Sequence, residues 1–158
     1  MNDLYMVNPF SDDDLRMVKD FNTDTYHKLL NIRKNYNYDE YLNLLNYSVV
    51  SENYYSTIKD SKIVNFFTVC CEKDTRISYV YPIVNLHSRD IINKITENLI
   101  LNQSMEEVFV FVLKDDIKTL NSLTLDNNYI SLFTKDDTIY VPFVKDRSLE
   151  MEFKRRKY

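Results

Sequence analysis

Residues 76–113 read "RISYVYPIVNLHSRDIINKITENLILNQSMEEVFVFVL" and contain the elements that decide the fold class. The stretch opens with a strand pattern over residues 76–84 and ends with the unbroken apolar run Val108–Leu113, which is typical of a strand buried on both faces. Between the two strands, apolar residues recur at helical spacing, namely Ile91, Ile92, Ile95 and Leu99. This order predicts a right-handed β-α-β crossover between two parallel strands.

Further strands and helices are predicted on both sides of this crossover. Strands at residues 53–60 and 63–71 are joined by tight turns, which predicts an antiparallel meander together with the strand at 76–84. The other predicted elements are a strand at 3–10, helices at 11–21, 23–34, 38–46 and 115–128, a hairpin over 129–144 that turns at 135–137, and an edge strand at 149–156. We therefore expect one α/β domain over residues 1–158, with a mixed, mostly antiparallel sheet, one parallel crossover and helices on both faces.

Two of the first helices carry patterns that predict local contacts. Ser11 is a good N-cap, and Asp14 stands three residues later, where the partner in a capping box belongs. In the helix at 38–46, Tyr41, Leu44 and Leu45 share one face and are expected to face the core.

The chain contains no glycine and no alanine, a bias that a strongly AT-rich coding sequence would explain. Every glycine-based motif is therefore excluded, including the P-loop, the dinucleotide fingerprint and the nucleophile elbow. Backbone positions with positive φ are expected to be filled by Asn or Asp. In particular, Asn127 and Asn128 stand where a glycine would normally cap the helix at 115–128.

The charge and hydropathy of the chain exclude several classes of partner. Its net charge is -4 over 158 residues, which argues against nucleic acid, and the basic run "KRRKY" at the C-terminus is interpreted as a solvated strand end. No apolar run is long enough to cross a membrane, and the acidic N-terminus lacks the apolar region of a signal peptide. We expect a cytoplasmic protein that binds neither nucleic acid nor membrane.

Cysteine and histidine are too sparse to suggest a metal site. Cys70 and Cys71 are adjacent in a predicted strand and point to opposite faces, so they are interpreted as small buried hydrophobic residues. His27 and His87 are the only histidines. We expect no metal.

The order of elements resembles the GNAT N-acetyltransferase superfamily, and the resemblance covers nearly the whole chain. Three stretches resemble family segments: "VFVFVLKDDIKTL" (108–120), "LTLDNNYI" (123–130) and "LEMEFKR" (149–155). In the second, Asn128 stands for the family's glycine and Tyr129 for its aromatic residue. The resemblance implies acetyl-CoA as cofactor, with its pantetheine arm in a gap where the strand before the crossover leaves the next strand.

Proline at position 82 fits such a gap, since it lacks the N–H that a strand ladder needs, but it would equally well end the strand early. If the two strands were hydrogen-bonded along their full length, there would be no room for the cofactor. The resemblance places cofactor binding on the strand end and the loop that enters the helix, at Ile83, Val84, His87, Ser88, Arg89, Ile91 and Ile92.

The family's pyrophosphate loop, R/Q-x-x-G-x-G/A, has no glycine in this chain. Asp90 puts a negative charge where an anion should lie, and Ile92 puts a branched side chain where the backbone should approach closely. His87 and Arg89 offer compensating positive charge. A second interpretation is that Ser88 or Asp90 simply caps the helix.

The catalytic residues are unknown. Thr124 holds the place of the family's acidic tyrosine, and a threonine hydroxyl is a far poorer proton donor. No general base is evident, and Glu52 is interpreted as a surface residue that precedes its strand. Tyr79 and Tyr81 either face the acyl group or pack in the groove.

Two functions are compatible with these residues. The first is an acyl-CoA-dependent N-acetyltransferase that acts on an unidentified amine by direct transfer, which needs mainly positioning. The alternative is a degenerate, non-catalytic binding or regulatory module of the GNAT fold that has lost CoA binding, with a homodimer as one form. The acidic net charge suits a small amine or a basic peptide as substrate or partner.

Overall fold

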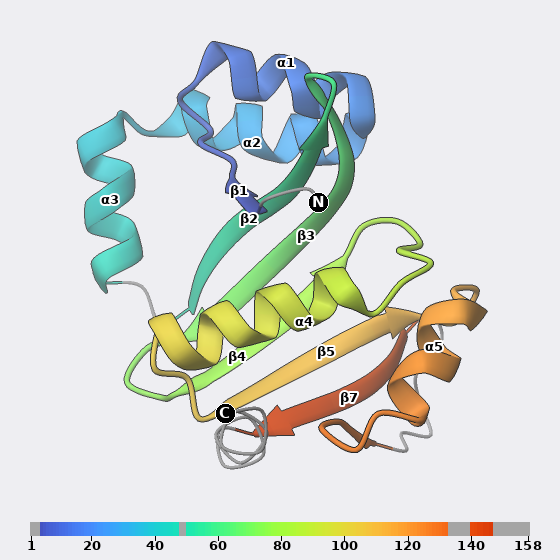
Figure 1. Cartoon of the computed structure of the whole chain (residues 1–158). Coiled ribbons are helices and arrows are strands. Elements are labelled where there is room, and N and C mark those ends of the chain that lie inside the picture. The colour runs from blue at the N-terminus through green and yellow to red at the C-terminus, as the bar shows by residue number, and fades with distance from the viewer. Residues whose placement is uncertain (1–3, 48–49, 133–139, 147–158) are drawn as a thin grey trace.

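Seven strands form one mixed sheet in the computed structural model, which describes residues 4–47, 50–132 and 140–146 (Figure 1). The strands are β1 Leu4–Met6, β2 Val50–Lys59, β3 Lys62–Glu72, β4 Ile77–Pro82, β5 Glu107–Leu113, β6 Ile130–Ser131 and β7 Tyr140–Asp146, in the spatial order β1-β2-β3-β4-β5-β7-β6. Neighbouring strands are antiparallel except for β4 and β5, which are parallel. The predicted mixed sheet with one parallel crossover is confirmed.

Helices cover both faces of this sheet. They are α1 Asp12–Phe21, α2 Thr23–Asn35, α3 Tyr38–Tyr47, α4 Asp90–Glu97 and α5 Ile117–Thr124, and α4 continues as a π-helical turn over Asn98–Asn102. Figure 1 shows α4 crossing β4 and β5 on one side, with α5 beside it, while α1 and α2 lie at the far end over β2 and β3. No helix in the described part of the chain is long and apolar enough to span a membrane.

Each face has its own hydrophobic core. Under α4 and α5, strand residues such as Phe67, Val80 and Val110 pack against Ile92 and Ile95. On the other face, α1 and α2 pack over β2 and β3, with Val18, Leu29, Tyr54 and Phe66 in the centre. The first core spans the whole crossover, whereas the second ends at the edge of β4, where Ile83 is only partly buried.

Several predicted boundaries need correction. The strand predicted at 3–10 covers only β1, and the helix predicted at 115–128 covers only α5. In α3, Tyr41 is buried as expected, but Leu44 is 42% exposed, because α3 packs on the edge of the sheet rather than across its face. The turn at 135–137 and the strand at 149–156 lie outside the described residues.

The predicted capping contacts of α1 are half correct. Ser11 caps α1 by accepting a hydrogen bond from the N–H of Asp14 (3.3 Å). The carboxylate of Asp14, however, does not return to Ser11. It is buried and accepts hydrogen bonds from Tyr5 and from the N–H of Asn8, both at 2.8 Å. Asp14 therefore fixes the connection between β1 and α1.

Positive φ angles do not occur where asparagine was expected to supply them. Within the described ranges they occur at Asp60, Ser61, Asp74, His87 and Ser104. Asn127 and Asn128 have none, and α5 ends at Leu125 with ordinary helical angles. In this chain Asp, Ser and His take the place of glycine.

The prediction that β5 is buried on both faces is wrong. Val108, Val110 and Val112 are completely buried, but Phe109 and Phe111 on the opposite face are only partly buried. The apolar run reflects one covered face and one aromatic face.

Candidate functional site

The parallel ladder between β4 and β5 ends before either strand does. It joins Ile77–Val80 to Glu107–Val110, so Tyr81 and Pro82 lie beyond it. Both residues stay paired with β3, while the end of β5 stays paired with β7. The two strands therefore separate after Val80. Pro82, which has no backbone N–H, lies in the part of β4 that no longer pairs with β5.

A buried carboxylate connects the two segments that leave the separated strands. Asp116, 1% exposed, is the N-cap of α5 and follows β5. It accepts hydrogen bonds from the N–H groups of Leu86 (2.7 Å), His87 (3.3 Å) and Thr119 (3.4 Å). The hydroxyl of Thr119 also donates to the carbonyl of Ser88 (3.4 Å). The loop after β4 is thus held directly on the N-terminus of α5.

Aromatic rings stack across the same gap on the opposite face of the sheet. The rings of Tyr81 and Phe111 lie 4.5 Å apart and 5° from parallel. Tyr140 of β7 packs edge-on against both of them, at 5.7 and 6.3 Å. The backbone gap between β4 and β5 is therefore bridged by side chains.

The apolar residues predicted to bind a cofactor lie in different places. Ile92 is fully buried, and Ile91 packs against the same core. Ile83 packs against the core under α1 and α2, and its N–H donates to the carbonyl of Phe66 (2.9 Å). Val84 is partly exposed. Ile92 thus turns inward, so its branched side chain does not lie at the loop surface.

The polar residues of the predicted loop lie together at the start of α4. His87 is exposed and has a φ of 57°. The residue in the N-cap position is Arg89, which makes no side-chain capping bond, so the expectation that Ser88 or Asp90 caps α4 is wrong. Instead, Ser88 accepts a hydrogen bond from the N–H of Asp90 (3.2 Å), and Arg89 forms an ion pair with Asp126 (3.3 Å).

Comparisons by sequence find no relative: no family model and no curated protein matches this chain. Solved structures match it along nearly its whole length. N-acetyltransferase PseH from Campylobacter jejuni is 13% identical, with a TM-score of 0.57 over 92% of this chain and 97% of that one. A variant of spermidine N-acetyltransferase SpeG from Vibrio cholerae is 10% identical, with a TM-score of 0.65 over 96% and 99%. The chain has the GNAT fold.

The GNAT fold raises the question of acetyl-CoA, since PseH has also been solved with acetyl coenzyme A (13% identity, TM-score 0.56, 93% and 99% coverage). The diphosphate of such a cofactor needs free N–H donors or positive charge. Here Asp116 already occupies two loop N–H groups, Asp90 adds an exposed acid, and the guanidinium of Arg89 is paired. The residues present therefore do not fit an acyl-CoA in the GNAT gap.

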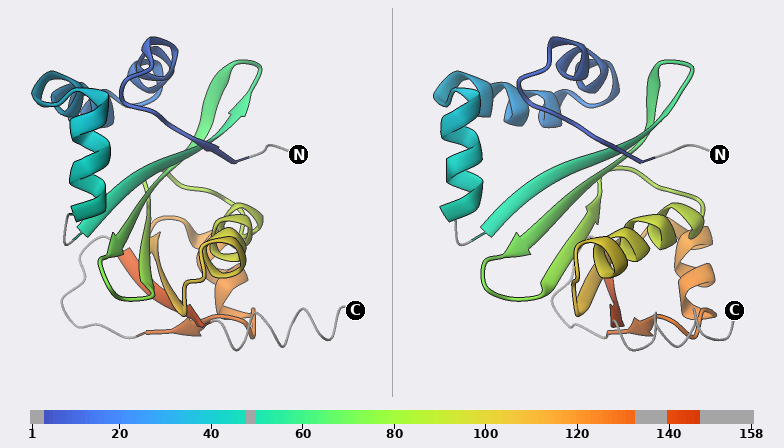
Figure 2. Two further views of the ribbon diagram at one scale, coloured as in Figure 1. Left: turned by 90° about the vertical axis from the view of Figure 1, so that its left-hand side faces the viewer. Right: turned by 60° about the vertical axis from the view of Figure 1, so that its left-hand side comes forward.

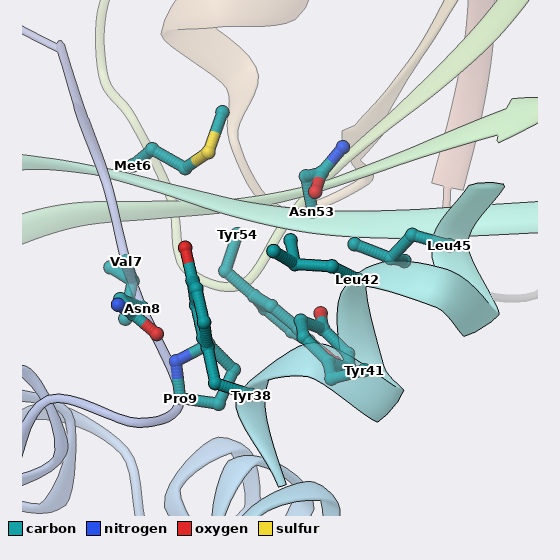
Figure 3. A pocket seen from close by; sticks show the side chains of 10 residues that line it. All are labelled: Met6, Val7, Asn8, Pro9, Tyr38, Tyr41, Leu42, Leu45, Asn53 and Tyr54. Atoms are coloured by element: carbon teal, nitrogen blue, oxygen red, sulfur yellow. The ribbon is translucent and has the colours of Figure 1, made fainter. Parts of the chain in front are cut away.

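Four cavities lined by described residues lie elsewhere in the fold, and no side chain of β4 or β5 lines these four. Figure 3 shows one of them, of about 160 Å³, between α3, β2 and the segment before α1. Tyr38, Tyr41, Leu42 and Tyr54 line it, with no charged side chain, so its only ionisable groups are tyrosine phenols. No sequence pattern had predicted this cavity.

The residues considered for catalysis in the sequence lie in separate places. Thr124 donates its hydroxyl to the carbonyl of Leu120 (2.7 Å) within α5, so that hydroxyl is engaged in the helix. Glu52 is exposed, as expected, but lies inside β2 rather than before it. Burial, followed by the charge of Glu52, raises the pKa of both Tyr41 and Tyr54 above the ordinary tyrosine value, which makes these phenols weaker acids.

The cysteines are free, as expected, but only partly buried. Burial and the charges of Glu52 and Cys71 raise the pKa of Cys70 to about 11, and Lys28 opposes this shift. A thiol with so high a pKa is a poor nucleophile at neutral pH. No group of His, Cys, Asp or Glu side chains within the described ranges could hold a metal ion.

Proposed function

We propose that this chain is a non-catalytic binding domain of the GNAT fold that works without acyl-CoA in the gap between β4 and β5. The observation that carries the proposal is the bridge from Asp116 to the loop after β4. The N–H groups of Leu86 and His87 point at a carboxylate of the chain itself. A cofactor in this place would find these N–H donors already bonded and would lie beside the negative charge of Asp116.

Opening this bridge for a cofactor carries a large energetic cost. The carboxylate of Asp116 is 1% exposed and would lose partners while it stayed buried. Leaving a buried charged group without its hydrogen bonds costs about 3 kcal/mol or more. A diphosphate would add like-charge repulsion with Asp116 and Asp90.

A second candidate function is direct acetyl transfer from acetyl-CoA to an amine. Two observations favour it: β4 leaves β5 after Val80, and α4 begins without a side-chain cap. In that case the first turn of α4, His87 and Arg89 would hold the diphosphate, and the cofactor would supply the acetyl group. The loop would first have to leave Asp116. Positioning a neutral amine then becomes the main task of the protein, because no acid or base stands ready in the gap.

Thermal unfolding with acetyl-CoA separates these two functions. A ligand at one hundred times its dissociation constant adds about 2.7 kcal/mol of stability to the folded state. We expect no shift in Tm at millimolar acetyl-CoA. Arg89→Gln is the companion variant: a saturable shift in the natural chain that this variant weakens would establish acyl-CoA binding at this loop and refute the proposal.

A further inference from the structure

The cavity beside α3 lies away from the gap between β4 and β5. In both views of Figure 2, α3 stands beside β2 and apart from α4 and α5. Figure 3 shows the side chains of α3, β2 and the segment before α1 that surround this cavity of about 160 Å³. Apolar and aromatic side chains form most of the lining, together with Asn8 and Asn53. We call this space the α3 cavity.

The α3 cavity has a buried floor and an accessible rim. Among its lining residues, Val7, Tyr41 and Tyr54 are 3%, 8% and 6% or less exposed in that order of listing, at 3%, 8% and 3%. Tyr38 and Leu42, in contrast, are 49% and 39% exposed. A small molecule can therefore enter past the rim and lose most of its contact with water at the floor.

A phenylalanine outside the lining holds two of the walls in place. The ring of Phe10 packs edge-on against Tyr38, with centroids 5.6 Å apart and planes at 83°. The same ring lies 5.5 Å from the ring of Tyr41, at an angle of 50°. Aromatic pairs of this geometry are favourable beyond the area that they bury. The chain itself thus orders these walls, so a ligand would lose little free energy in ordering them.

The lining contains polar groups that the described residues leave without a hydrogen bond. Tyr41 is buried, yet no described residue forms a hydrogen bond with its hydroxyl. The side-chain amide of Asn53, which is partly buried, likewise has no hydrogen-bond partner among the described residues. Buried polar groups in folded proteins are nearly always hydrogen-bonded. A molecule in the α3 cavity that carries an oxygen atom would supply an acceptor for the phenol of Tyr41.

The electrostatics of the α3 cavity favour an uncharged ligand. No charged side chain is among the described residues that line it. A cation would lie there without a carboxylate to pair with, and burying an unpaired charge is unfavourable. Glu52 is exposed and is not part of the lining. Burial and then the charge of Glu52 raise the pKa of Tyr41 and Tyr54, so this charge acts on the floor of the cavity and opposes an anion.

The size of the α3 cavity corresponds to one ring. Sites for drug-sized ligands measure about 300 Å³ or more, whereas an apolar cavity of about 150 Å³ holds a benzene-sized molecule. Three of the lining residues are tyrosines, namely Tyr38, Tyr41 and Tyr54. They favour an aromatic ring over an aliphatic group of the same size, because aromatic pairs attract each other beyond the area that they bury.

We propose that the α3 cavity binds an uncharged molecule with one aromatic ring and a hydroxyl or carbonyl oxygen. The ring packs among the tyrosine and leucine side chains of the lining, and the oxygen accepts a hydrogen bond from the hydroxyl of Tyr41. This rests on the proposed function, since it names the ligand of a binding domain.

The test uses the full chain and benzyl alcohol, with toluene as a probe that lacks the oxygen. Two-dimensional NMR should show saturable shifts of the resonances around the α3 cavity with both probes at millimolar concentration. Benzylammonium and benzoate carry a charge on a molecule of similar size, and each should bind at least about tenfold more weakly than benzyl alcohol.

Three variants locate the binding. Tyr41→Phe removes only the hydroxyl and should raise the Kd of benzyl alcohol about threefold to tenfold, while that of toluene changes less than about twofold. Leu42→Trp fills the cavity and should abolish the binding of both probes. Leu44 is 42% exposed on the same helix and is not part of the lining, so Leu44→Trp should leave both Kd values within about twofold.

Failure of both probes to bind, or equal binding of benzyl alcohol and either charged probe, would overturn this inference. The same holds if Leu42→Trp and Leu44→Trp have equal effects, or if Tyr41→Phe affects both probes equally. Circular dichroism shows that each variant keeps its fold, and Tyr41→Phe still decides the matter should Leu42→Trp unfold. Acetyl-CoA is titrated separately. If acetyl-CoA binds, the proposed function fails, whereas failure of benzyl alcohol alone leaves the non-catalytic assignment intact and removes only the ligand.

Discussion

The two faces of strand β5 differ in burial: one is buried under helices, and the other is partly exposed. Val108, Val110 and Val112 are completely buried under α4 and α5. Phe109 and Phe111 alternate with them and are partly exposed on the aromatic face. Large rings on an open strand face contribute little burial for their size. The difference indicates that the covered face contributes more to the stability of the fold than the aromatic face does.

The gap beside β5 shows the same contrast. On the covered face it is bridged by Asp116, a buried group with several hydrogen bonds. On the aromatic face it is bridged by the stack of Tyr81 and Phe111, whose rings stay partly exposed. Opening the first bridge costs more free energy than opening the second, because it leaves a buried carboxylate without hydrogen bonds.

The largest expected effect comes from removing the buried bridge. Asp116→Ala deletes the N-cap of α5 and leaves the buried N–H of Leu86 and the partly buried N–H of His87 without this acceptor. We expect a loss of about 3–5 kcal/mol in the free energy of unfolding, measured by urea denaturation. Asp115→Ala changes an exposed neighbour and should cost less than about 0.5 kcal/mol.

A small loss for Asp116→Ala would break the comparison between the two bridges. If the variant lost less than about 1 kcal/mol, the loop would be only weakly held on α5. The same variant also tests the gap itself. Should it gain a Tm shift with acetyl-CoA that the natural chain lacks, Asp116 would be the group that keeps the cofactor out.

The next largest effect compares adjacent residues on β5. Val110→Ala removes two buried methyl groups from the core under α4 and should cost about 2–3 kcal/mol. Phe109→Thr removes a larger side chain from the aromatic face, yet should cost less than about 1.5 kcal/mol, because the ring is partly exposed. Urea denaturation of both variants checks the order. The reverse order would mean that the aromatic face is a core.

Much of the fold follows from local patterns in the sequence. The crossover was predictable because a helical period separates two strand patterns within residues 76–113. The apolar run Val108–Leu113, however, cannot show which face a helix covers, and Phe109 is as apolar as Val110. Likewise, α3 has the period of a buried helix, but its place at the sheet edge leaves Leu44 exposed. Periodicity predicts an element, whereas coverage depends on where its neighbours lie.

The candidate site was less predictable because its main contact is distant in sequence. The loop after β4 suggested a choice between a cofactor and a cap at Ser88 or Asp90. The structure shows a third outcome, in which Asp116 holds the loop and His87 takes a positive φ. No sequence pattern near residue 87 predicts the contact with Asp116. The sequence shows that Asp116 follows β5, but its hydrogen bonds to the loop after β4 depend on the tertiary fold.

The smallest expected effect concerns a surface ion pair beside β5. Glu106 pairs with Arg76 at 3.4 Å, and both side chains are exposed. Glu106→Gln should therefore lower the free energy of unfolding by at most about 1 kcal/mol, because water screens an exposed pair. Urea denaturation at low and high salt measures the change, and added salt should reduce it. A larger loss that salt leaves unchanged would show that Glu106 contributes by packing and not by its charge.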